Sequence, residues 1–168
     1  MSFSALLAAN ARGMLDLLQA RIADLGDEEM SWAPVEDCLR MGEPAPQVSH
    51  FDGTPSPVAT IGWRLEHIAA GLTEERIVQW LSAPVDVPAV PAHETAEQLR
   101  AWVASAADWF CGLVTSLGDE HLAQPLGPVA GMWGGGPRAG FVMHMTNEAI
   151  HHGAEVAVLR DLWRAGLR

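Results

Sequence analysis

The sequence predicts an all-α fold, a four-helix bundle with long connecting loops rich in proline and glycine. Three observations lead to this prediction. Apolar residues recur at helical spacing in four long stretches, no stretch alternates with period two, and proline and glycine gather between the stretches. Four helices without strands bury their apolar faces most simply as a bundle. Because the chain has 168 residues and 49% hydrophobic content, residues 1–168 are expected to form one domain.

The first two helices are expected in the N-terminal half. The first covers about residues 4–25, where leucine, methionine and isoleucine form one apolar side. The second is predicted over about residues 57–81, because Thr54 or Ser56 can cap it and the proline at its start suits a first turn. It should end before the next proline.

The other two helices are bounded by glycine. The third is predicted over about residues 95–117 and should stop at Gly118. The fourth should begin after the GGGP segment at 134–137 and reach about Trp163. Segment 134–137 follows no predicted strand, which argues against a phosphate-binding loop.

The predicted connections cover about residues 26–56, 82–93 and 118–137 and are long for a bundle. Such loops more often cover a functional site than serve only as linkers. The segments LGDEEMSWAP (25–34) and LGDEHLAQPL (117–126) resemble each other. This similarity suggests two related helix pairs.

Composition excludes several classes of function. The net charge of −11 leaves no basic surface for nucleic acid or anionic membranes. The absence of a signal sequence and of a long apolar run predicts a soluble, cytoplasmic protein with two reduced cysteines. All ten basic residues are arginine, which is typical of a GC-rich bacterial genome. No G-x-S-x-G or C-x-x-C motif is present.

The fourth predicted helix carries His144, Glu148 and His152, each four residues after the last. Glu148 and His152 fall within its apolar stripe, where a carboxylate and an imidazole cost several kcal/mol unless they are paired. A divalent metal would pair them, and this ligand type suits zinc or nickel. The alternative, a solvated face with incidental pairs, stays open for Glu148 and His152 and is preferred for His144. His151 lies on the flank of the stripe.

A metal held by protein side chains needs a third ligand. Among the remaining histidines only His67 lies within a predicted helix, and its helical position alone favours a structural role. His50, His93 and His121 fall in predicted loops beside polar residues or proline, and we interpret them as surface residues.

Two stretches resemble the DinB-like superfamily of four-helix-bundle metalloproteins: TIGWRLEHIAAG (60–71) and HMTNEAIHHGAEVAVLRDLW (144–163). The resemblance implies a divalent metal held by His67, Glu148 and His152. In most relatives the position of Glu148 holds histidine, and Arg-Gly-Gln stands in place of residues 153–155. A His/Glu/His set is similar to the zinc site of the mycothiol-dependent maleylpyruvate isomerase branch.

This resemblance implies a thiol-dependent S-transferase or isomerase that acts on a small molecule through a metal-bound thiolate. The thiol would be a low-molecular-weight one such as mycothiol, which also suits the lysine-free composition. We assign Arg138 or Arg64 to an anionic substrate, although no motif or spacing selects them. Two alternatives are a non-catalytic metal-binding or stress-response bundle and a metal-dependent hydrolase. Exposed tryptophans could also pair two copies into a homodimer.

Overall fold

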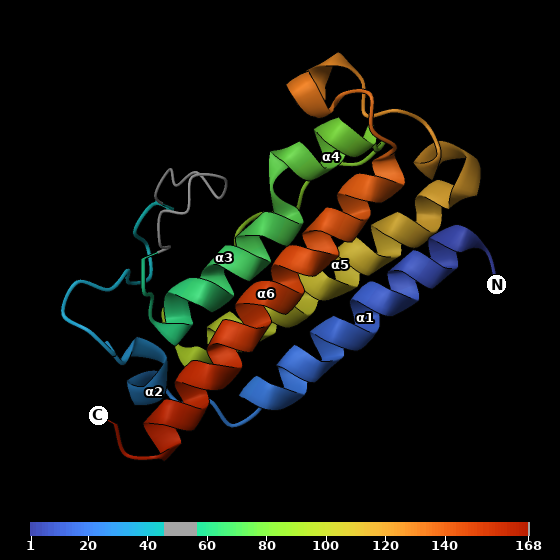
Figure 1. Ribbon diagram of the computed structural model, residues 1–168. Coiled ribbons are helices and arrows are strands. Elements are labelled where there is room, and N and C mark those ends of the chain that lie inside the picture. The colour runs from blue at the N-terminus through green and yellow to red at the C-terminus, as the bar shows by residue number, and fades with distance from the viewer. Residues whose placement is uncertain (46–56, 168) are drawn as a thin grey trace.

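The computed structural model describes residues 1–45 and 57–167, and four long helices pack there as a bundle (Figure 1). Within these two ranges the chain forms no strand, which confirms the predicted all-α bundle. The long helices are α1 (Phe3–Ile22), α3 (Ile61–Thr73), α5 (Ala96–Leu122) and α6 (Arg138–Arg164). The short ones are α2 (Asp27–Ser31), α4 (Glu75–Leu81) and the 3₁₀ helix η1 (Pro128–Trp133).

The long helices form a closed arrangement in which α1 and α3 each pack against both α5 and α6. Helices α3 and α5 run in the same direction, and α1 and α6 run in the opposite direction (Figure 1). The connection after α4 must therefore return along the bundle to reach the start of α5. None of the helices in the described part of the chain is long and apolar enough to cross a membrane.

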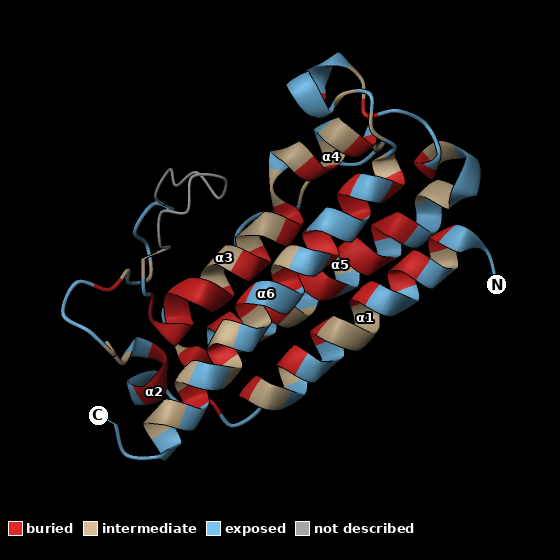
Figure 2. Ribbon diagram, in the orientation of Figure 1, coloured by how far each residue is buried: buried red, intermediate tan, exposed pale blue. Residues whose placement is uncertain are grey.

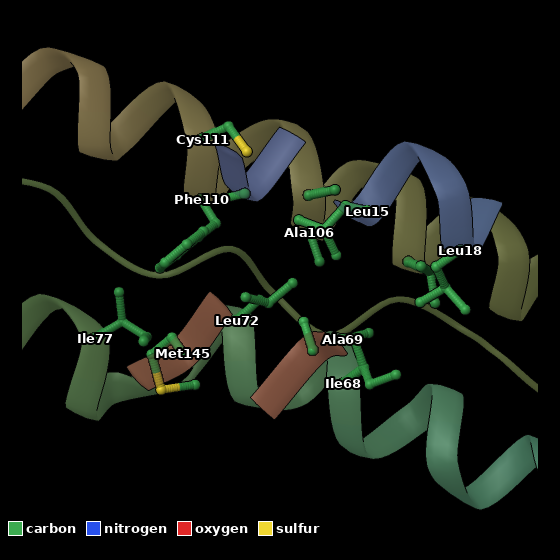
Figure 3. Packing of buried hydrophobic residues seen from close by; sticks show 14 of the residues in the cluster. Leu15, Leu18, Ile68, Ala69, Leu72, Ile77, Ala106, Phe110, Cys111 and Met145 are labelled. Atoms are coloured by element: carbon green, nitrogen blue, oxygen red, sulfur yellow. The ribbon is translucent and has the colours of Figure 1, made fainter. Parts of the chain in front are cut away.

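The core lies along the inward faces of the four long helices, where the buried residues gather (Figure 2). Leu15 of α1, Leu72 of α3, Phe110 of α5 and Met145 of α6 contribute to it, as Figure 3 shows. Each large apolar side chain buried in this way stabilises the fold by roughly 1.5–3 kcal/mol. The core fixes the facing surfaces of α3 and α6, on which the polar cluster described below is built.

The prediction of one continuous helix over residues 57–81 is wrong, because the helix is interrupted at Glu74, which separates α3 from α4. Glu74 is extended, with φ −77° and ψ 156°. At about 100° per residue, an unbroken helix would place Ile77 and Leu81 roughly 140–180° from Leu72. The break turns both side chains inward, and each is 0% exposed. Burial of two large apolar residues therefore overrides the local continuity of the helical pattern.

The predicted start of the second helix also differs from the structure. Thr60 is the N-cap of α3, and its hydroxyl accepts a hydrogen bond from the backbone N–H of Trp63 at 3.2 Å. Pro57 precedes the helix and is not part of its first turn. The two expected caps, Thr54 and Ser56, lie outside the described residues.

The two similar LGDE segments have similar structural roles. Asp27 accepts a hydrogen bond from the first N–H of α5, on Ala96, at 2.7 Å. Asp119 accepts from the N–H groups of Phe3 (3.0 Å) and Ser4 (2.7 Å) at the start of α1. Each segment thus provides an acceptor for backbone N–H groups that have no partner within the neighbouring antiparallel helix, at its N-terminus. Gly118, directly before Asp119, has φ 73°, a left-handed conformation that glycine adopts without strain. The predicted end of the helix at Gly118 is therefore a kink, and one more helical turn follows it.

Candidate metal centre

His152 is the most firmly held member of the predicted site. It lies on α6, is 8% exposed, and its Nδ1 lies 2.7 Å from Oε2 of Glu155. The same carboxylate oxygen forms an ion pair with Nε of Arg64 on α3, at 2.9 Å. Nδ1 also lies 3.5 Å from NH1 of Arg64, but the contact with Glu155 is much shorter. Because a carboxylate only accepts hydrogen bonds, we infer that Nδ1 carries the proton and that Nε2 presents its lone pair. Histidine ligands of metals are commonly oriented by a carboxylate in this manner.

Glu155 is held as a carboxylate by its neighbours. Burial raises the pKa of Glu155, but the hydrogen bond from His152 and the charge of Arg64 lower it more, so the net shift is downward. Arg64 is itself only 7% exposed and also donates to the carbonyl of Pro57 at 3.2 Å. Burial lowers the pKa of Arg64 and Glu155 opposes that shift. Arg64 therefore supports His152, whereas the sequence suggested that it receives substrate.

Glu148 faces the open nitrogen of His152. Its Oε2 lies 3.6 Å from Nε2 of His152, one helical turn away. Two ligand atoms on one tetrahedral zinc, each about 2.0–2.1 Å from the ion, lie about 3.3–3.5 Å apart. The pair therefore fits a single ion with little movement. The expectation that Glu148 is buried is wrong, since its side chain is 37% exposed and lies at the edge of the apolar stripe.

Geometry adds His151 to this pair. One ligand atom from each of Glu148, His151 and His152 lies within 4.8 Å of the other two, which is a spacing that could hold a metal ion. The side chain of His151 is 59% exposed, and its ring stacks on that of His152 with centroids 4.8 Å apart. His151 lies on the flank of the apolar stripe, but it is three residues after Glu148 and therefore close to it on the helix surface. A flank position thus does not exclude His151 from the cluster.

His67 approaches the same place from the opposite helix. Its ring lies edge-on to His152, with centroids 4.9 Å apart, and stacks on Trp63 at 5.0 Å. Burial, followed by the charges of His152 and Arg64, lowers the pKa of His67. The neutral imidazole that binds metals is thereby favoured. In the described conformation His67 is not part of the three-residue cluster, and its role as a ligand stays a prediction.

A cavity of about 480 Å³ opens beside these residues. Its walls come from α3, α4 and α6, and its polar lining consists of His67, Glu74, Arg76, His144, Glu148 and His152. His144 contacts Glu148 only at 3.9 Å and is 53% exposed, which agrees with its expected position on the flank. A small molecule could therefore reach the cluster without unfolding any helix.

The other histidines are less simple than the sequence suggested. His93 is half-buried against Trp102 and lies 3.2 Å from Glu66, so its interpretation as a surface residue is wrong. His121 is also half-buried and lies 2.6 Å from the carbonyl of Leu81. His50 lies outside the described residues.

Arg138, the other arginine expected to receive substrate, has protein partners. It lies 2.8 Å from Nε2 of His121 and 2.8 Å from the hydroxyl of Ser82. These contacts join the start of α6 to the ends of α4 and α5. The cation that lines the cavity is instead Arg76, which has no motif around it and gave no signal in the sequence.

Comparison with known proteins agrees with this architecture. The DinB superfamily model matches residues 11–156, a span that includes His67, Glu148 and His152. Neither the curated proteins nor the solved structures contain a match. Because the family model covers most of the sequence, the chain belongs to the DinB superfamily.

Proposed function

We propose that this protein binds one divalent metal ion at Glu148 and His152 and uses it to act on a small molecule. The observation that carries the proposal is the Nε2 of His152, oriented by Glu155 and 3.6 Å from the Glu148 carboxylate. Of this pair His152 is buried, and a buried ring nitrogen without a partner is costly. His67 or His151 would supply the third ligand, from the facing helix or from the same helix.

The cavity favours an open site over a closed structural one. A closed site surrounds its metal with four protein ligands, whereas an open site keeps a position for water or a ligand. Here about 480 Å³ of space adjoins the cluster, and two or three side chains supply the ligand atoms. This arrangement supports chemistry, or at least ligand binding, at the metal.

The reaction we propose is S-transfer or isomerisation that depends on a low-molecular-weight thiol such as mycothiol. When bound, zinc or nickel would lower the pKa of a coordinating thiol and hold it as a nucleophile at neutral pH. The residues of the chain would then have distinct tasks. Glu155 and Arg64 orient His152, while the cavity gives the small molecule access to the metal.

Cobalt substitution tests the proposal. Protein loaded with Co(II) is titrated with cysteine and N-acetylcysteine as probe thiols, and the near-ultraviolet spectrum is recorded. We expect a thiolate-to-cobalt charge-transfer band that saturates with thiol and is absent in His152→Ala. A cobalt spectrum that stays unchanged with either thiol would contradict thiol chemistry and would leave the metal with a structural role.

The third ligand is identified by the same spectra with two matched variants. His67→Ala and His151→Ala remove one imidazole each, from α3 and from α6. The variant that loses the ligand-field bands of cobalt identifies the ligand, whereas the other should retain them. If both variants keep the wild-type spectrum, neither residue is a ligand and the three-ligand site is wrong.

A further inference from the structure

A second cavity, of about 490 Å³, adjoins the first. The two cavities share Arg76 and His144, so they adjoin each other beside α4 and α6. The second cavity is mainly apolar, and its larger lining residues are Trp80, Leu126, Trp133, Pro137 and Phe141. Its size is that of a site for a small organic molecule.

The walls of this cavity are aromatic. Trp80 of α4 and Phe141 of α6 lie with ring centroids 4.8 Å apart at 47°. Trp133 of η1 lines this cavity and is 53% exposed, so its ring is accessible to a ligand there. Three aromatic side chains around one space favour a flat, apolar occupant that can pack against their faces.

Arg76 contributes a guanidinium to the lining of this space. Its guanidinium lies over the rings of Trp80 (5.4 Å) and Phe141 (5.7 Å), which hold it in place. Glu74 accepts from Nε at 2.8 Å and forms an ion pair with NH2 at 2.5 Å, and NH2 also lies 3.9 Å from the sulfur of Met145. Within the described residues NH1 makes no hydrogen bond, so this atom remains available to an anionic oxygen.

We propose that the second cavity binds the ring system of an aromatic carboxylate, with the carboxylate on Arg76. The ring would pack between Trp133 and the Trp80–Phe141 pair. Because Arg76 and His144 line both cavities, a substituent on such a ligand would extend toward Glu148 and His152. The inference deepens the proposed function by naming a substrate class, and that last step rests on it. Binding of the ring and its carboxylate does not require metal.

Calorimetric titration with 2-naphthoate tests the site, first on metal-free protein and then on zinc-loaded protein. We expect saturable one-to-one binding in both. Trp133→Ala should weaken it about tenfold or more, because one aromatic wall is lost. Met132→Ala is the matched control: Met132 neighbours Trp133 in η1, is 88% exposed and does not line the cavity. Its affinity should equal that of the wild type.

The role of Arg76 is tested with two naphthalene ligands, one anionic and one neutral. In Arg76→Gln the affinity for 2-naphthoate should fall about tenfold, whereas that for the neutral 2-naphthalenemethanol should stay the same. Retained binding of the alcohol also shows that the cavity is intact.

Three results would overturn the inference. These are the absence of saturable binding by wild-type protein, equal losses in Trp133→Ala and Met132→Ala, or equal losses of both ligands in Arg76→Gln. A protein that binds naphthoate as expected but takes up no metal would contradict the proposed function alone, and the aromatic site would stand.

Discussion

Glu155→Gln isolates the contribution of one supporting carboxylate. The change keeps the size of the side chain and removes its charge. In the folded protein that carboxylate accepts a hydrogen bond from His152 at 2.7 Å and forms an ion pair with Arg64 at 2.9 Å. The variant should therefore loosen the imidazole and leave the guanidinium without its ionic partner. Two measurable quantities should change, which are metal affinity and the free energy of unfolding of the metal-free protein.

The expected magnitudes follow from the burial of the two partners. Loss of a carboxylate that orients a ligating histidine typically weakens metal binding by about 10–100-fold. Arg64 is only 7% exposed, so loss of its partner is costly, but Glu155 is 31% exposed and solvent compensates in part. We expect a loss of about 1–2 kcal/mol in the free energy of unfolding. For a chain of this length that corresponds to a decrease of about 2–8 °C in Tm.

Zinc affinity is measured by competition with a chromophoric chelator, and stability by thermal unfolding of the metal-free protein. Glu97→Gln is the control, because Glu97 is exposed on α5 and far from the cluster in the sequence. It should match the wild type in both assays. If Glu155→Gln binds zinc as tightly as the wild type, Glu155 does not orient a ligand and the support we describe for His152 is wrong.

Two further predictions concern the framework. Arg160 is 0% exposed and holds Glu29 through two hydrogen bonds of 2.7 and 2.9 Å. Glu29→Gln should therefore lower the free energy of unfolding by about 2–3 kcal/mol in a urea titration, whereas the same change at exposed Glu28 should cost less than about 0.5 kcal/mol. Hydrogen bonds from the backbone N–H groups of Ser4 and Phe3 lower the pKa of Asp119 below its ordinary 3.8. The ionised Asp119 therefore stabilises the fold fully above about pH 3.8, and this contribution is lost as pH falls through the lowered pKa. Asp119→Asn should unfold more readily than wild type at pH 7, and urea titrations at decreasing pH should show the difference shrink below about pH 4; a constant difference would contradict the assignment.

The architecture follows from residue patterns because helical periodicity and glycine or proline stops are local signals. The break at Glu74 is harder to predict, since no glycine or proline occurs at that position. The angular positions of Ile77 and Leu81, however, already conflict with one straight helix. The two LGDE segments are visible as a repeat, but their capping role needs the antiparallel neighbour and is a tertiary property.

The candidate site was predictable only in part. Spacing and the resemblance select Glu148 and His152, which the structure brings together. The role of Glu155 was missed, although its i,i+3 spacing from His152 was a usable signal. Arg64 and Arg76 come from other helices, so their contacts depend on packing that a single sequence does not reveal. The choice between His67 and His151 depends on where the two rings lie relative to Glu148 and His152, which no sequence pattern encodes.

Metal content tests the central claim most directly. Purified wild-type protein and the Glu148→Ala and His152→Ala variants are loaded with zinc or nickel, dialysed and measured by elemental analysis. Glu97→Ala serves as the control. We predict about one equivalent of metal in the wild type and the control, and a loss of most of it in both cluster variants. Wild-type protein that retains neither metal, or cluster variants that retain a full equivalent, would contradict a metal centre at Glu148 and His152.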